Sequence, residues 1–213
     1  MGKLNIQIVP VTAFQQNCTL IWDADTNTGV VIDPGGDVGK IRKAIEDSGI
    51  KVEAIWLTHG HIDHAGGAMD LKDALGIDII GPHEADIPLL SQLEKQAQMF
   101  GLDDEVRNVT PDRWLTSGET LSIGEHDFTV SHCPGHAPGH VVFYNEANGF
   151  AHVGDVLFAG SIGRTDLPGG DHETLLNSIR TVLMEWPDEV QFMCGHGAPS
   201  TIGQERASNP FLT

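Results

Sequence analysis

Thr58-His59-Gly60-His61-Ile62-Asp63-His64 is the stretch that decides the fold of this chain. It places three imidazoles and a carboxylate within six residues, directly after the apolar residues 54–57. Histidine and aspartate bind borderline divalent ions such as zinc. In an extended segment His59 and His61 point to the same side, so both can bind one ion. Asp63 and His64 follow where the chain turns into a helix and point elsewhere. One ion takes about four ligands, so we expect further ligands downstream.

Three downstream residues meet this expectation, each beside a glycine at the end of a predicted strand: His136, Asp155 and His196. Glycine permits tight loops and close approach of the backbone. A polar loop with unrelated histidines would explain the first stretch alone, but it would not explain three matching positions further along the chain.

The apolar pattern predicts an α/β fold in which strands and helices alternate in each half of the chain. We predict strands over residues 3–11, 17–22, 29–33, 54–58, 77–80, 120–123, 126–131, 140–144, 150–153 and 190–193. We predict helices over residues 37–48, 65–75 and 172–186, and over 83–100 with an interruption at Pro88. This order predicts two sheets packed together with helices outside, and one domain over residues 1–213.

Composition restricts the class of protein. The formal net charge of −18 disfavours nucleic acid as a partner, because such a surface repels phosphates. The three cysteines are odd in number and far apart, which argues against a disulfide framework. The sequence has no apolar run of the roughly 20 residues that a membrane span needs, and no signal peptide is recognised at its start. We expect a cytoplasmic protein with no membrane partner.

The chain resembles the metallo-β-lactamase superfamily, because it has five motifs in the order typical of that superfamily: Asp33, the T-H-x-H-x-D-H run, His136, Asp155 and His196. The stretch Cys-Pro-Gly-His-Ala-Pro-Gly-His at residues 133–140 is similar to the glyoxalase II group, and the chain most resembles the short, single-domain hydroxyacylglutathione hydrolases of bacteria. The resemblance implies an αβ/βα four-layer sandwich, with two mixed sheets face to face and helices outside.

The resemblance also implies two divalent metal ions, with zinc expected and iron or manganese as alternatives. His59, His61 and His136 would hold the first ion. Asp63, His64 and His196 would hold the second, and Asp155 would bridge both. Asp33 would fix the loop that carries the histidines.

The implied activity is hydrolysis of S-D-lactoylglutathione to D-lactate and glutathione, a step of methylglyoxal detoxification. A hydroxide between the two ions, held with the help of Asp63 and Asp155, would attack the thioester carbonyl. The partner is then a small anionic thioester, a glutathione conjugate, and the protein is expected to be a monomer or small homo-oligomer.

Substrate binding is the least determined part of this expectation. Longer glyoxalase II enzymes hold glutathione with a Lys-x-Tyr pair and a C-terminal helical domain. Here Arg164 and Asp166 replace the pair and we expect no such domain, which leaves Arg164 as the candidate anion anchor. Two alternatives stay open: a persulfide dioxygenase with one iron on His59, His136 and Asp155, and a metal-binding module without catalysis.

Overall fold

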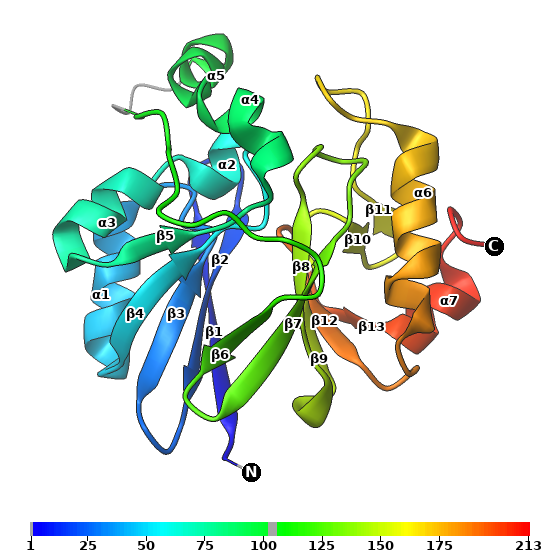
Figure 1. Cartoon of the computed structure of the whole chain (residues 1–213), viewed down its shortest axis with the longest axis horizontal. Coiled ribbons are helices and arrows are strands. Elements are labelled where there is room, and N and C mark those ends of the chain that lie inside the picture. Colours follow the sequence, from blue (N-terminus) through cyan, green and yellow to red (C-terminus); the bar gives the residue numbers. More distant parts are fainter. Residues whose placement is uncertain (1, 102–105) are drawn as a thin grey trace.

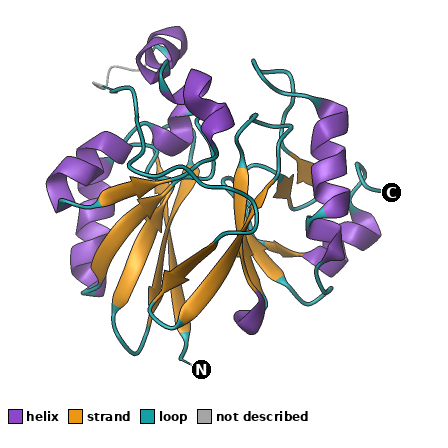
Figure 2. Cartoon of the chain, viewed as in Figure 1, coloured by secondary structure: helices purple, strands orange, loops and turns teal. Residues whose placement is uncertain are grey.

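Two β-sheets lie face to face, and helices cover the outer side of each (Figure 1). The structure is a computed structural model and describes residues 2–101 and 106–213. Figure 2 shows the resulting layers, with helices, sheet, sheet and helices following one another across the molecule. The predicted four-layer α/β sandwich is confirmed. That residues 1–213 form one domain, without a helical glutathione-binding domain, stays a prediction.

The first sheet has the strand order β1-β2-β3-β4-β5, with antiparallel pairs up to β3 and parallel pairs from there to β5. Helices cross over its outer face between the parallel strands, as parallel connections require. Its elements are β1 (Leu4–Val11), β2 (Gln16–Asp23), β3 (Thr28–Ile32), α1 (Val38–Ser48), β4 (Lys51–Trp56), α2 (Ile62–Ala65), α3 (Ala68–Leu75) and β5 (Asp78–Ile80).

A short helical segment, which we call the flap, connects the two sheets above one end of the sandwich (Figure 1). It consists of the 3₁₀ helix η1 (Glu84–Asp86), α4 (Ile87–Leu90) and α5 (Leu93–Phe100). The segment is broken, as predicted, but the two α-helices do not separate at Pro88. Pro88 lies in the first turn of α4, where a missing N–H is tolerated, and the break comes at Ser91 and Gln92.

The second sheet has the order β13-β12-β9-β8-β7-β6, with one parallel pair, β9 and β12. A separate hairpin, β10 with β11, lies beside it. Its elements are β6 (Thr120–Ile123), β7 (His126–His132), β8 (Val141–Asn145), η2 (Glu146–Asn148), β9 (Phe150–His152), β10 (Leu157–Phe158), β11 (Ser161–Ile162), α6 (His172–Thr181), η3 (Leu183–Glu185), β12 (Gln191–Met193), β13 (Ser200–Thr201) and α7 (Ile202–Ser208).

The helix predicted over residues 172–186 is too long. α6 ends at Thr181, and the apolar spacing continues because η3 keeps Leu183 fully buried. Trp186 is extended, as expected for a residue before proline. The sequence patterns also missed β10, β11, β13 and α7, because elements of this length carry too few residues for a period to be recognised.

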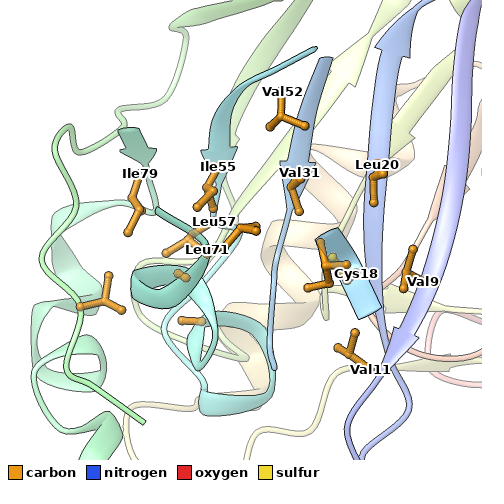
Figure 3. Packing of buried hydrophobic residues seen from close by; sticks show 14 of the residues in the cluster. Val9, Val11, Cys18, Leu20, Val31, Val52, Ile55, Leu57, Leu71 and Ile79 are labelled. Atoms are coloured by element: carbon orange, nitrogen blue, oxygen red, sulfur yellow. The ribbon is translucent and has the colours of Figure 1, made fainter. Parts of the chain in front are cut away.

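Apolar residues form three clusters that match the layers. One lies beneath α1 and α3 on the outer face of the first sheet, and it includes Leu20, Val31 and Ile55 from the strands and Leu71 from α3 (Figure 3). A second lies beneath α6. The third fills the space between the sheets, where Trp56 makes ring contacts with Phe128 and Phe143 at 5.6 and 5.1 Å. This central cluster fixes how the two sheets face each other.

Within residues 2–101 and 106–213, no helix combines the length and apolar character that a membrane crossing requires.

Candidate metal centre

The predicted ligands lie at one end of the two sheets, in loops and in the short helix α2. His59 and His61 follow β4, and α2 carries the next two, Asp63 and His64. The second sheet supplies the other three from the ends of β7, β9 and β12: His136, Asp155 and His196. Because β3, β4 and β5 run parallel, the loop after β4 is at the edge where α/β folds place their sites. The centre therefore lies where the two sheets meet.

Three imidazoles form the first cluster. His136 Nε2 lies 2.9 Å from His61 Nδ1 and 3.3 Å from His59 Nε2. His136 Nδ1 is 2.8 Å from the carbonyl oxygen of Arg164, so Nδ1 carries the proton and the Nε2 lone pair faces the cluster. The ligand atoms of the three side chains lie within 4.8 Å of one another. The structure thus brings the predicted first ligand set together.

Asp63, His64 and His196 form the second cluster, again with ligand atoms within 4.8 Å. His196 Nε2 lies 3.1 Å from Asp63 Oδ2. Asp155 stands between the two clusters: its Oδ1 is 3.4 Å from His64 Nε2, and its Oδ2 is 3.6 Å from both His136 Nε2 and His196 Nε2. This is the position that the predicted bridging role requires.

Asp33 supports the centre from behind. Its carboxylate accepts hydrogen bonds from the backbone N–H of Thr58 at 2.7 Å, the Thr58 hydroxyl at 2.6 Å and His64 Nδ1 at 2.9 Å. Asp33, His59 and His64 also make a tight group of potential ligands. However, both Asp33 oxygens are already engaged, so we assign Asp33 to holding the loop and not to binding an ion.

The charge states of His59, His61 and Asp155 suit a divalent cation. Burial and the neighbouring imidazoles lower the pKa of His59 well below its usual value, and burial lowers that of His61 to about 3. Burial raises the pKa of Asp155, but His64, His136 and His196 together outweigh this effect and the net pKa is lowered. His136 Nε2 lies 2.9 Å from His61 Nδ1 and 3.3 Å from His59 Nε2. If these nitrogens carry no proton, their lone pairs face and repel one another, and only a cation or a proton between them relieves this repulsion.

Unsatisfied atoms lead to the same conclusion. Among the buried side-chain atoms of the described residues, His64 Nε2 and Asp155 Oδ1 have no hydrogen-bond partner. Gly195 keeps these groups accessible, because a Cβ there would lie 2.1 Å from Asp155 Oδ1 and 2.4 Å from His64 Cε1. The residues present therefore fit a metal centre.

A cleft of about 760 Å³ opens over the centre, which is within the range of small-molecule sites. Its floor includes Asp63, His136, Asp155 and His196. Its walls are mostly apolar, and they come from the β1–β2 turn, α2, the flap, the loop after β7 and the segment that follows β9: Phe14, Ile62, Pro88, Leu89, Met99, Phe100, Pro138, Phe158, Ile162, Leu167 and Pro168. Phe14 and Phe100 meet edge to face at 5.7 Å and join two of these walls.

Two cations line the cleft. Arg164 is one of them, as the sequence predicted, but its guanidinium makes a two-pronged pair with Asp166 at 2.7 Å for each bond. Lys95, on α5, is the other, and sequence reasoning missed it. An exposed lysine on an amphipathic helix carries no signal of its own, and only the fold places α5 over the centre. The anchoring role of Arg164 stays a prediction.

Comparison with known proteins assigns the family. The Metallo-beta-lactamase superfamily matches residues 11–196. The chain belongs to this superfamily. Among curated members, hydroxyacylglutathione hydrolase GloC of Haemophilus influenzae is 49% identical over 210 residues, with 98% of each chain covered. The predicted superfamily, its glyoxalase II-type group and the assignment to metallohydrolases are confirmed. Membership, together with the His/Asp clusters, implies divalent metal ions.

Two solved structures of the superfamily are similar to the chain over nearly its whole length. The BLEG-1 B3 metallo-beta-lactamase matches with a TM-score of 0.89 and 36% identity, covering 98% of this chain and 100% of that one. TTHA1623, in a di-iron-bound form, matches with a TM-score of 0.87 and 36% identity, covering 97% and 100%.

Proposed function

We propose that this protein is a binuclear metal-dependent thioester hydrolase that cleaves S-2-hydroxyacylglutathione, with S-D-lactoylglutathione as substrate, to the hydroxy acid and glutathione. The observation that carries the proposal is the pair of ligand clusters joined by Asp155 at the floor of an apolar cleft with cations at its rim. The 49% identity to hydroxyacylglutathione hydrolase GloC supports the choice of substrate.

Two divalent ions bound here would activate water and stabilise negative charge on the carbonyl oxygen. The chain's own groups prepare the site for them. Asp33 and the Arg164 carbonyl fix which nitrogen of His64 and of His136 carries the proton, and this directs the other nitrogen inward. The carboxylates of Asp63 and Asp155 are held ionised by the surrounding imidazoles, which lower the pKa of each despite burial.

The cleft suits a thioester. Its apolar walls exclude water from the carbonyl and the sulfur, while Lys95 and Arg164 offer positive charge to the carboxylates of glutathione. Hydrolysis forms a C–O bond, breaks the C–S bond and releases glutathione as a thiolate. A thiolate is a good leaving group, so the site needs no dedicated general acid. We also propose that the protein is cytoplasmic, binds zinc in both sites, and is a monomer or small homo-oligomer. We propose no nucleic-acid or membrane partner.

The test is an assay of purified, zinc-loaded protein with S-D-lactoylglutathione, with the released thiol measured by a chromogenic disulfide. We expect turnover with kcat/KM in the usual enzymatic range of about 10⁴ M⁻¹s⁻¹ or more. The same preparation is given a chromogenic cephalosporin, because a 36% identical neighbour is a β-lactamase. It is also loaded with iron and given glutathione persulfide, with oxygen consumption recorded.

Absence of thiol release from metal-loaded protein would overturn the proposal. Cephalosporin turnover or oxygen consumption in its place would identify the activity that replaces it. Asp112→Asn serves as the control for loss of a carboxylate outside the cleft and should keep the full activity. Asp112 pairs with Lys72 on the outer surface and does not line the cleft.

A further inference from the structure

Asp86 is a buried carboxylate outside both ligand clusters, and it touches the loops that carry them. It ends η1 at the start of the flap, and its side chain is fully buried. One oxygen accepts the backbone N–H of Gly60 at 2.7 Å, and Gly60 lies between His59 and His61. The other accepts the N–H of Gly139, in the loop that carries His136.

The flap and these loops interlock closely at the same place. A Cβ on Gly139 would lie 2.5 Å from the carbonyl oxygen of His83 and 2.6 Å from the Asp86 nitrogen. A Cβ on Gly60 would lie 2.9 Å from Leu89 Cβ in α4. Such contacts leave no room for a side chain at either glycine, so the three segments pack tightly against one another around Asp86.

Gln96 of α5 adds a third connection. Its side-chain oxygen accepts the N–H of Ile62 at 3.1 Å, at the start of the helix that carries Asp63 and His64. Its side-chain nitrogen donates to the carbonyl oxygen of Leu89 at 3.0 Å. The flap thus contacts the ligand-bearing segments of both sheets, with Asp86 at the centre of the contact.

We propose that Asp86 is a positioning residue: its carboxylate sets the spacing between the His59–His61 loop and the His136 loop, and through η1 it fixes the flap over the cleft. Asp86 touches no predicted ligand and acts through the backbone on both sides. The proposal concerns the metal centre and the flap, and it holds whatever substrate the protein cleaves.

The two hydrogen bonds from Gly60 and Gly139 require a carboxylate at position 86. Two backbone N–H groups approach the two oxygens of Asp86 from different segments. An amide of the same size has one oxygen and one NH₂, so one N–H would face a donor. Burial raises the pKa of Asp86 and the two N–H groups partly counteract this effect, which leaves the pKa at about 6, so the carboxylate is mostly ionised at neutral pH.

The experiment compares Asp86→Asn with Asp23→Asn in the full chain. Asp23 is also buried, at 2% exposure, and also accepts a backbone N–H, from Asp25 at 2.8 Å. It ends β2, whose other end, Gln16, reaches the centre, so about 23 Å of strand separate it from the site. Zinc affinity is measured by competition with a chromophoric chelator, the cobalt-loaded proteins are compared by visible absorption, and urea unfolding is followed for each.

We expect Asp86→Asn to weaken zinc binding about 10- to 100-fold and to alter the cobalt spectrum, the effect typical of residues that support metal ligands. Asp23→Asn should lose stability without either change. If Asp86→Asn does not fold, Asp86→Ser replaces it, because its hydroxyl accepts one of the two N–H groups and should give an intermediate loss.

An Asp86→Asn protein with the zinc affinity and cobalt spectrum of the parent overturns the proposal. So does an equal loss of zinc affinity in Asp23→Asn, because general destabilisation would then explain both. Neither measurement uses a thioester, so failure of the proposed activity leaves this test unaffected.

Discussion

His64 and His136 each contact an oxygen outside the ligand clusters, and this contact sets the orientation of the imidazole and the position of its proton. His64 shows this most clearly: its Nδ1 contacts Asp33 at 2.9 Å and its Nε2 faces Asp155. Burial lowers the pKa of His64, but Asp155 and Asp63 outweigh burial and raise it well above the usual value. In the metal-free protein His64 therefore carries a second proton, on Nε2, and a metal ion that binds to Nε2 must displace this proton.

Asp33→Asn tests the supporting role of Asp33. The amide cannot accept from Thr58 and His64 at both ends, so His64 loses its fixed tautomer. We expect about a 10- to 100-fold loss of zinc affinity, measured by chelator competition. Unchanged affinity would contradict the role, and Asp47→Asn, on exposed α1, provides the control.

Asp155→Ala tests the bridge between the clusters. Since the Asp155 carboxylate faces His64, His136 and His196, its loss should weaken zinc binding by more than the roughly 100-fold expected for a supporting residue. Thioesterase activity should fall with it. Equilibrium dialysis with metal analysis gives the stoichiometry, and a variant that retains full zinc content and activity would rule out a bridging role.

The sequence predicted which residues the fold brings together at this scale. His59, His136 and Asp155 are far apart in the chain, yet strand ends marked them as candidates and the resemblance to the superfamily implied that they share one site. Asp86 and Lys95 were not predicted, because the sequence around each residue does not indicate that the flap lies over the metal centre. Their roles arise only from contacts across the fold, with Gly60 and Gly139 for Asp86 and with the cleft for Lys95.

At the level of elements, the flap supplies much of the cleft wall and its lysine. Lys95→Ala should raise KM for S-D-lactoylglutathione about two- to fivefold with little change in kcat, because an exposed ion pair contributes about 0.2–1 kcal/mol. Arg164→Ala should have a smaller effect, since Arg164 is already paired with Asp166. Steady-state kinetics at low ionic strength measure both.

Lys43→Ala, on the exposed face of α1, is the matched control for loss of a positive charge. A KM for Lys95→Ala equal to that of this control would exclude Lys95 from substrate binding.

β9 carries a buried histidine that connects the two sheets, with His152 Nε2 lying 3.3 Å from the Thr19 hydroxyl of β2. Burial lowers the pKa of His152 from 6.5 to about 4. The unfolded chain therefore binds this proton below pH about 6.5 while the folded chain does not, so stability falls as pH drops from about 6.5 to about 4. The contribution is at most about 3 kcal/mol.

His152→Asn should remove this part of the pH dependence in the metal-free protein. Urea unfolding from about pH 7 to about pH 4.5 should show the free energies of unfolding of the two proteins converging as pH falls. Parallel curves would mean that His152 is protonated equally in both states.

For the molecule as a whole, the ligands come from both sheets, so a bound ion joins the two halves of the sandwich. We expect zinc at 100 times its dissociation constant to stabilise the fold by about 2.7 kcal/mol per site. For a chain of this length, the stabilisation by one occupied site corresponds to a rise in Tm of about 5–10 °C. Differential scanning calorimetry with and without a chelator measures the rise, and Asp155→Ala should show less of it.

The layered architecture was predictable because the strand and helix order admits few packings. Its details were not: Trp56 against Phe128 and Phe143 sets how the sheets meet, and no local pattern specifies such a contact. Short elements such as α7 were missed for the same reason, since contacts with the rest of the fold, such as that of buried Ile202, hold them in place.

The flap lies within the connection between β5 of the first sheet and β6 of the second, and it belongs to neither sheet. Its sequence can therefore be exchanged for that of a relative without altering any strand pairing or any predicted metal ligand. Such a graft would change the shape and charge of the cleft while the reaction centre stays the same. Two positions would have to be carried into every graft, Asp86 and Gln96, because through them a new flap would attach to the catalytic loops.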